Sequence, residues 1–405
     1  MKPAFGAPSR RRSFSGRLSR IENVQAPSRN YLQKSLLMTE SDQTRSVVDL
    51  APTTWEEPAG DREAWWPLDI PTYDGDPSVG HPSVVFAPQG WNGYRYWMAF
   101  TPFPDGKREN PSIVGSQDGV RWRVPDGATN PVVSAEEVRR AGFSCNSDPE
   151  LVLTADGQML LYYRPFSRRN EAIFCKRSED GVEWSSAQMV LSSRAVRYPA
   201  QLLSPAVEVG TDGVLTMWTV NGPTLGRRVV ERRTSLDGLQ WSPPERCAVP
   251  RGVNPWHIDV APAGGQYHML VSDRTRLFYW TSQDGRTWTG SRRKAVGRSG
   301  TAYDARGHYR STFVAAWSAS PRWDIWITGT DGSGRNVFFD VWRIGLLRNV
   351  DLAADGPEEA GWDRRPEWRW RCQHLRGQSL ERVLIGIDRL RQTVHRLVTQ
   401  GRAMR

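Results

Sequence analysis

Short apolar runs separated by polar turns recur along the centre of the chain, and four of the turns share one motif. Ser-x-Asp-Gly-x-x-Trp is written as SQDGVRW (116–122), SEDGVEW (178–184), SLDGLQW (235–241) and SQDGRTW (282–288). Asp-Gly between two extended runs predicts a hairpin, because the turn needs residues that tolerate positive φ. We expect each copy to be a hairpin tip, in which Ser and Asp bond the turn and Trp covers it.

The copies are 47 to 62 residues apart, a period typical of propellers and other arrays. Each unit also opens with an apolar strand that follows polar residues, and a second strand follows after a turn. Two further strands flank the motif, so each unit reads as the four-stranded blade of a β-propeller. The four opening strands are HPSVVFAP (81–88), SDPELVLT (147–154), LSPAVEVG (203–210) and WHIDVAPA (256–263).

A fifth unit begins with HYRSTFVAA (308–316) and keeps the opening strand without the motif. Five units predict an all-β fold, a five-bladed β-propeller over residues 48–350. Residues 48–75 contain apolar runs that would supply the strand closing the ring. The motif's Asp and Trp residues are interpreted as parts of the scaffold rather than as catalysts.

Composition supports many short strands and turns, since the chain has 19 Trp, 36 Gly and 28 Pro. No segment approaches the apolar length of a membrane span. The start of the chain is basic and rich in Ser, without the apolar core of a signal peptide. We therefore expect synthesis in the cytoplasm without a signal peptide, with a virion as one destination. A mitochondrial presequence is the alternative interpretation.

The four cysteines are scattered and form no CxxC pair, which argues against a disulfide framework and against a cysteine-type zinc site. We interpret Cys145, Cys175, Cys247 and Cys372 as buried free thiols. No metal and no cofactor is expected from this pattern.

The net charge of +10 is placed unevenly. Residues 1–50 carry nine Lys and Arg against four acids, and residues 363–405 carry eleven Arg against four acids. The propeller between them is close to neutral, so nucleic acid is not expected as its partner. Residues 1–47 are expected to form a basic arm, which is either extended and docked on an acidic partner or solvated and disordered.

Apolar residues return at heptad spacing near the C-terminus, which predicts a helix over residues 379–401 after a linker at 351–378. Such a helix serves docking on other proteins of an assembly or oligomerisation as a coiled coil, or it packs on the propeller. Its apolar positions are Leu380, Val383, Ile387, Leu390, Val394 and Leu397.

The stretch HPSVVFAPQGWNGYRYWMAF, together with SDPELVL and SPAVEV, resembles five-bladed propellers of the arabinanase/β-xylosidase-type glycosidase superfamily over residues 75–345. The four motif copies are also similar to the Asp-box repeats of sialidases. The resemblance implies an acid and a base, both carboxyl groups, at the propeller axis. Asp148 matches the family's Asp-Pro opening. His81 stands where the family presents Asp, and the third blade opens with Ser204 and shows no Glu at the general-acid position.

The catalytic set predicted in this way is incomplete. If the chain is a catalyst, its carboxyl groups would be Asp148, Asp76 and Asp259. His81 and His257 are either structural or ligand-binding, and Trp91 and Tyr94 either stack on sugars or belong to the core. The predicted ligand-binding residues are His81, Asp148, His257, Asp259, Tyr309, Arg310 and Trp256.

Three classes of function follow. The first is a glycan-recognising propeller that is a structural component of a larger assembly, such as a bacteriophage virion or tail. The second is a glycoside hydrolase with axial carboxylates, and the third is a protein-interaction propeller without a small ligand. The sequence favours the first class, because the basic ends call for a partner and the acid/base set is incomplete.

Overall fold

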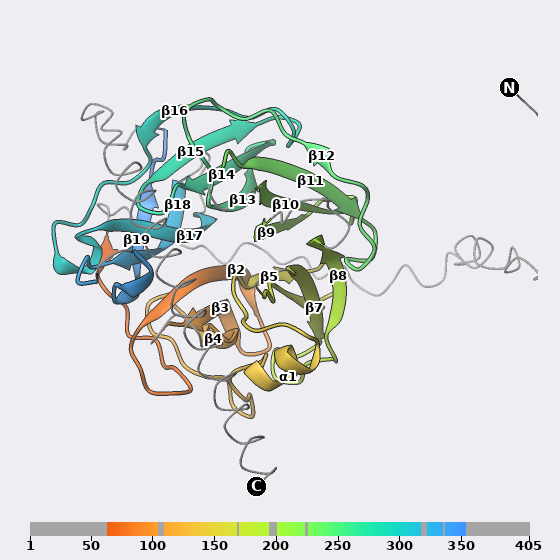
Figure 1. The fold of residues 1–405 in the computed structure, drawn as a ribbon. Coiled ribbons are helices and arrows are strands. Elements are labelled where there is room, and N and C mark those ends of the chain that lie inside the picture. The colour runs from red at the N-terminus through yellow and green to blue at the C-terminus, as the bar shows by residue number, and fades with distance from the viewer. Residues whose placement is uncertain are drawn as a thin grey trace, which may run out of the picture. The chain divides into compact units, whose positions relative to one another are not determined.

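A computed structural model describes residues 63–103, 109–167, 170–193, 201–222, 226–316, 322–334 and 337–353. These residues form five antiparallel sheets around a common centre (Figure 1). The prediction of an all-β, five-bladed propeller is confirmed. The predicted basic arm, most of the linker and the C-terminal helix lie outside the described residues.

Each sheet is one blade, and its strands follow one another in the order of the chain, except that β1 is the outer strand of blade five. Blade one holds β2 (Val79–Trp91), β3 (Tyr94–Pro102) and β4 (Ser112–Ser116), and blade two holds β5 (Glu150–Leu153), β6 (Met159–Tyr163), β7 (Ala172–Ser178) and β8 (Gln188–Ser192). Blade three holds β9 (Gln201–Val209), β10 (Leu215–Gly222), β11 (Val229–Ser235) and β12 (Glu245–Arg246), and blade four holds β13 (His257–Ala263), β14 (Gln266–Ser272), β15 (Leu277–Ser282) and β16 (Thr289–Lys294). Blade five holds β17 (Gly307–Ala316), β18 (Arg322–Thr330), β19 (Trp342–Val350) and β1 (Ala64–Trp65).

The ring is closed by the two ends of the propeller sequence. β1 pairs with β19 through Ala64 opposite Leu347 and Trp65 opposite Leu346, so residues that precede blade one complete blade five. This is the region in which the sequence predicted a closing strand. The inner strands β2, β5, β9, β13 and β17 contact one another in that order, and β17 contacts β2 again. The opening strands therefore surround the axis (Figure 1).

Blade one departs from the predicted four strands. It has three, and the stretch after its motif forms only an isolated bridge between Gly115 and Arg123. The chain then enters α1 (Ala135–Arg140), where Ser134 caps the first turn. The other helical turns described are the 3₁₀ helices η3 (Ala302–Asp304) and η4 (Val337–Phe339). None of the helices in the described ranges is long and apolar enough to cross a membrane.

The core is divided among the interfaces between blades. Met98 of blade one packs in one cluster with Trp326 of blade five, and Tyr162 of blade two packs with Met217 of blade three. The remaining three clusters likewise combine residues of neighbouring blades. Burial of large apolar side chains at these interfaces holds the ring together, at about 1.5–3 kcal/mol for each fully buried side chain.

The four motif copies make the same hydrogen bonds. In the first copy, the amide of Gly119 donates to Ser116 Oγ at 2.9 Å, and the amide of Arg121 donates to Asp118 Oδ1 at 2.8 Å. Asp180, Asp237 and Asp284 accept the corresponding amide bonds in the other copies. The four Asp residues therefore occupy equivalent hairpin positions. Their likeness to the Asp-box repeats of sialidases stays a prediction.

Each motif glycine also lies against an aromatic ring of the preceding blade. A Cβ atom on Gly119 would lie 2.8 Å from Trp326, and one on Gly285 would lie 2.9 Å from Trp218. The indole nitrogens of these two Trp residues donate to the same glycine carbonyls, at 2.9 and 2.7 Å. The glycine is thus required both by its positive φ and by the close approach of the preceding blade. The equivalent pairs are Gly181 with Trp97 and Gly238 with Tyr162.

Candidate active site at the propeller axis

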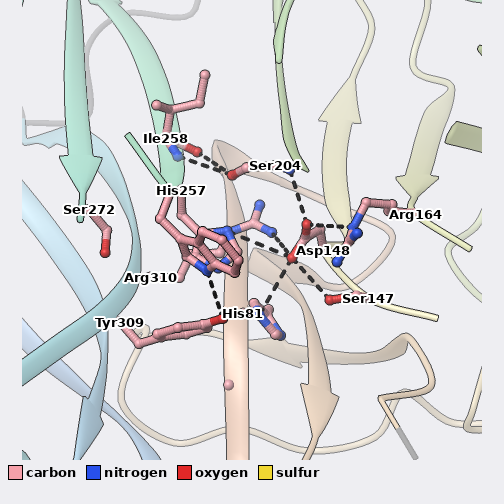
Figure 2. A network of polar contacts seen from close by, with 12 residues as sticks. His81, Ser147, Asp148, Arg164, Ser204, His257, Ile258, Ser272, Tyr309 and Arg310 are labelled. Carbon is pink, nitrogen blue, oxygen red and sulfur yellow. Dashed lines mark hydrogen bonds and ion pairs between the residues drawn. The ribbon is translucent and has the colours of Figure 1, made fainter. Parts of the chain in front are cut away.

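The inner strands begin with the same backbone irregularity in three blades. His81, Asp148 and Ser204 all have positive φ, at 53°, 49° and 51°, and each precedes a proline. Left-handed backbone is costly for residues with a side chain, and it clusters at functional sites. All three residues are buried, with 0 or 1% of their surface exposed. Figure 2 shows the side chains of His81 and Asp148 converging with those of His257 and Arg310, while the Ser204 hydroxyl bonds the backbone of Ile258.

Asp148 is the centre of this group. Its Oδ2 atom accepts hydrogen bonds from Arg164 Nε at 2.9 Å and from the Ser204 amide at 3.0 Å. Its Oδ1 atom lies 3.0 Å from Ser147 Oγ. Burial alone would raise the pKa of Asp148, but Arg164, the two histidines and Arg310 outweigh burial and hold the pKa well below its ordinary value. The carboxylate is therefore ionised and fixed in one orientation.

His81 turns a lone pair toward this carboxylate. Thr101 Oγ1 donates to the carbonyl of Gly80 at 3.4 Å, so we assign it as the acceptor of the 2.8 Å bond to His81 Nδ1. That tautomer leaves Nε2 without a proton, 3.5 Å from Asp148 Oδ1. Burial lowers the pKa of His81 to about 3, against the attraction of Asp148. Two electron-rich atoms thus face each other across a short gap.

His257 completes the arrangement from β13. Its Nδ1 atom lies 3.7 Å from the same Oδ1 atom of Asp148, and neither ring nitrogen has a hydrogen-bond partner among the described residues. Burial lowers the pKa of His257 well below its ordinary value, so the ring is neutral. A buried imidazole without a partner is costly, and a cation between His81, Asp148 and His257 would remove that cost.

These three residues form the one group in the described part of the chain whose ligand atoms suit a metal ion, all lying within 4.8 Å of one another. Two imidazoles and one carboxylate are the ligand set of many hydrolytic zinc sites and of facial-triad iron sites. Thr101 supplies the outer hydrogen bond that fixes a metal-binding histidine. The donor set therefore fits a divalent cation. The sequence analysis expected no metal because it considered only cysteine spacing, and that expectation remains a prediction.

Glu109 is a site residue that the sequence analysis missed. It lies in the connection between β3 and β4, outside the inner strands where candidates were sought. Its Oε2 atom accepts a 2.7 Å bond from Ser147 Oγ and lies 3.5 Å from His81 Nδ1. Burial raises the pKa of Glu109 to about 8, against the hydrogen bond from Ser147. Its side chain is 12% exposed, so it borders the buried group from the solvent side.

Arg310, Tyr309 and Trp256 lie where the sequence placed them, around the axis. Arg310 Nη1 is 3.7 Å from Asp148 Oδ1, and Nη2 donates to the carbonyl of Pro149 at 3.0 Å. The Tyr309 ring lies 4.7 Å from the ring of His257, and the Tyr309 hydroxyl accepts a 2.8 Å bond from Trp256 Nε1.

The other predicted carboxyl groups are not part of this group. Asp259 lines a separate axial cavity of about 300 Å³ together with Glu150 and Glu208. Burial raises the pKa of Asp259 to about 6, against the attraction of Arg310. Asp76 lies in the loop before β2, where its Oδ1 atom accepts a bond from the Ser78 amide at 2.8 Å.

Two aromatic residues considered as sugar platforms belong to the core instead. Tyr94 is 6% exposed and packs edge-on against Trp97. Trp91 packs in the same cluster, and its Nε1 atom donates to the carbonyl of Gly157 at 3.0 Å. Both hold blades one and two together.

The chain is similar to a carbohydrate-active enzyme in sequence. Over 280 residues it is 29% identical to the A type blood N-acetyl-α-D-galactosamine deacetylase of Flavonifractor plautii. The match covers 54% of this chain and 36% of that protein, so this chain spans little more than a third of the relative's length. No family model matches the chain.

A solved structure shares the fold of this chain. The crystal structure of an N-acetylgalactosamine deacetylase from F. plautii, in complex with blood group B trisaccharide, matches with a TM-score of 0.60 at 24% identity, over 73% of this chain and 97% of that chain. A GH43 β-xylosidase/α-arabinofuranosidase from a compost microbial metagenome matches with a TM-score of 0.48 at 12% identity, over 74% and 98% of the two chains.

These findings correct the function favoured by the sequence. The interpretation as a structural component of a bacteriophage particle is wrong, because the curated protein to which this chain is similar in sequence is a carbohydrate-active enzyme. The basic ends that suggested an assembly say nothing about the chemistry of the axis. The enzymatic alternative fits the comparisons better.

Proposed function

We propose that the chain is a metal-dependent hydrolase that removes the acetyl group from an N-acetylated amino sugar. The observation that carries the proposal is the convergence of His81 Nε2, Asp148 Oδ1 and His257 on one point, with both nitrogens of His257 lacking partners. The similarity to a deacetylase of N-acetyl-α-D-galactosamine supports the choice of substrate class.

Each residue has a separate task. His81, Asp148 and His257 would hold a divalent ion, which when bound polarises a carbonyl group and makes water more acidic. Arg164 and the Ser204 amide fix the second oxygen of Asp148, so the first oxygen stays directed at the ion. Thr101 keeps His81 in the tautomer that offers Nε2.

Glu109 is placed to move the proton that amide hydrolysis requires. Water adds to the acetyl carbon, the bond between carbon and nitrogen breaks, and acetate and a free amine result. In its ionised form, which prevails above its pKa of about 8, Glu109 would accept a proton from the water and deliver it to the leaving nitrogen. Its position beside His81 and Ser147, with part of its side chain exposed, suits contact with both substrate and solvent.

Glycoside hydrolysis is the second candidate, because two carboxyl groups have pKa values displaced in opposite directions. Burial raises the pKa of Glu109, while charged neighbours lower that of Asp148, and both groups lie within 3.0 Å of Ser147 Oγ. Such a pair can divide acid and nucleophile roles. Asp148 is nevertheless fully buried and engaged by Arg164, which suits a metal ligand better than a nucleophile.

The products distinguish the two reactions. The full chain is incubated with an aryl N-acetyl-α-D-galactosaminide, with added Zn²⁺ or Mn²⁺ or with EDTA, and acetate and aryl alcohol are both measured. The proposal requires release of acetate that EDTA abolishes and that Asp148→Asn lowers by at least 100-fold. Release of the aryl alcohol without acetate would establish the glycosidase instead.

A further inference from the structure

Glu171, the residue before β7, lies one ion pair beyond the candidate site. Its Oε2 atom is 3.1 Å from Arg164 Nη1, and Arg164 Nε donates to Asp148 Oδ2 at 2.9 Å. Figure 2 shows Arg164 directed at Asp148. The side chain of Arg164 is 9% exposed and that of Glu171 16%, so water screens these contacts little. One guanidinium group thus joins a proposed metal ligand to a second carboxylate.

Both carboxylates are also bonded to one strand of the neighbouring blade. The amide of Leu202 in β9 donates to Glu171 Oε2 at 2.9 Å. The amide of Ser204, two residues later in the same strand, donates to Asp148 Oδ2 at 3.0 Å. The backbone of β9 therefore fixes the two carboxylates relative to each other, and Arg164 bonds to both.

The backbone of Glu171 is fixed as well as its side chain. Its amide donates to Ser193 Oγ at 2.9 Å, and its carbonyl accepts a bond from the Ser193 amide at 2.8 Å. Glu171 also forms a β-bridge with Phe166, whose ring centroid lies 4.5 Å from the guanidinium carbon of Arg164. A carboxylate held in this way is preorganised to orient Arg164.

The charge of Glu171 matters in addition to its position. If Arg164 were paired with Asp148 alone, it would direct its positive charge wholly at the proposed ligand and weaken the attraction of Asp148 for a cation. With Glu171, one guanidinium group is shared by two carboxylates, so negative charge remains on Asp148 for the ion. Such effects are large in a buried site, where the effective dielectric constant is low.

We propose that Glu171 is a positioning residue of the metal site and acts through Arg164. It holds the guanidinium group against Asp148 Oδ2 and offsets its charge, so that Oδ1 stays directed at the ion. This inference rests on the proposed function for the presence of the ion. Outer partners of metal ligands contribute about 10- to 100-fold to metal affinity, and Glu171 lies one contact further out, so we expect an effect near the lower end.

Glu171→Gln removes the charge and keeps an oxygen that accepts from Arg164 and Leu202. Zn²⁺ and Mn²⁺ are titrated by calorimetry into the metal-free full chain, well below the melting temperature of each variant. The Kd of the ion that the wild type binds should rise about tenfold in Glu171→Gln. A merely structural role would lower the melting temperature and leave this Kd unchanged, which would overturn the inference.

Glu231→Gln is the matched control, because it removes the charge from a similar ion pair in blade three. Glu231 Oε2 is 3.0 Å from Arg233 Nη2, and the side chain of Arg233 is 9% exposed, like that of Arg164. The control should leave the Kd of the ion unchanged, even where its melting temperature falls as far as that of Glu171→Gln. An equal rise in Kd in the control would show a general loss of stability and would also overturn the inference.

A double-mutant cycle tests whether Glu171 acts through Arg164. In an Arg164→Gln background, the further change Glu171→Gln should raise the Kd by less than about twofold. A tenfold rise in that background would exclude Arg164 as the connection. A wild-type chain that binds neither ion would overturn this inference together with the metal-dependent function. A wild-type chain that binds an ion, with an unchanged Kd in Glu171→Gln, would overturn the positioning role alone.

Discussion

The indole of Trp326 in blade five donates a 2.9 Å hydrogen bond to the carbonyl of Gly119 in blade one, across the point at which the ring closes. The same contact recurs between Trp218 and Gly285. The repeated Ser-x-Asp-Gly-x-x-Trp motif is thus more than a turn, because its glycine receives the aromatic ring of the preceding blade. Each copy of the motif therefore helps to hold two neighbouring blades of the propeller together.

Gly119→Ala tests the contact between Gly119 and Trp326. The new Cβ would meet Trp326 at 2.8 Å and would adopt a φ of +70°. We expect a loss of about 2–4 kcal/mol in the free energy of unfolding, from backbone strain and overpacking together. Gly213→Ala is the control, since its φ is +77° and nothing lies within 4 Å. It should lose only about 1–2 kcal/mol in urea denaturation. Equal losses of unfolding free energy in the two variants would show that the contact between Gly119 and Trp326 does not contribute to stability.

The fold followed from the sequence because its signals are local and repeated. Asp-Gly turns and alternating strands such as HPSVVFAP need no knowledge of distant residues. The missing fourth strand of blade one did not follow. There, Gly115 and Arg123 make a single bridge before the chain leaves for α1.

The candidate site followed only in part. His81, Asp148 and His257 were selected because they open inner strands, and the structure brings those three together. The sequence did not reveal that these three residues form one ligand set, because each comes from a different blade and no local spacing relates them. Glu109 was missed because it lies in a loop, whose path to the axis depends on tertiary structure.

Thr101→Val tests the hydrogen bond between Thr101 Oγ1 and His81 Nδ1. Valine keeps the shape but cannot accept from His81 Nδ1, so the tautomer that offers Nε2 is no longer favoured. We expect affinity for Zn²⁺ to fall about 10- to 100-fold, with little change in the melting temperature. Thr101→Ser keeps the hydroxyl and should retain most of the affinity. If the valine variant binds Zn²⁺ as tightly as the wild type, Thr101 does not control the tautomer of His81.

Glu109→Gln tests the proton transfer. The amide cannot accept a proton, so kcat for acetate release should fall about 10²- to 10⁴-fold. The affinity for the divalent ion should stay close to that of the wild type, because Glu109 is not among the three ligands. An active glutamine variant would mean that another group carries the proton.

Glu208→Gln tests the carboxyl groups that line the axial cavity. Burial raises the pKa of Glu208 well above its ordinary value, and the nearby carboxyl groups of Asp259 and Glu150 add to the shift. Below the ordinary pKa of Glu, both folded and unfolded chains hold the proton. Above it, the unfolded chain ionises first, so stability falls as the pH rises toward the folded pKa.

Glutamine removes this dependence, and the melting temperature near neutral pH should rise by a few degrees. The gain should vanish at pH 4. The exposed Glu183→Gln serves as the control and should show neither effect. A Glu208→Gln variant that is less stable at pH 7 would show that the carboxylate is needed in its ionised form.

Isothermal titration of the metal-free full chain with Zn²⁺ and with Mn²⁺ measures the proposed metal site itself. We expect one site per chain for at least one of the two ions. The site should be lost in Asp148→Asn and in His257→Ala, while both variants keep the circular dichroism spectrum of the wild type. A wild-type chain that binds neither ion, or variants that bind as tightly as the wild type, would contradict a metal site at His81, Asp148 and His257.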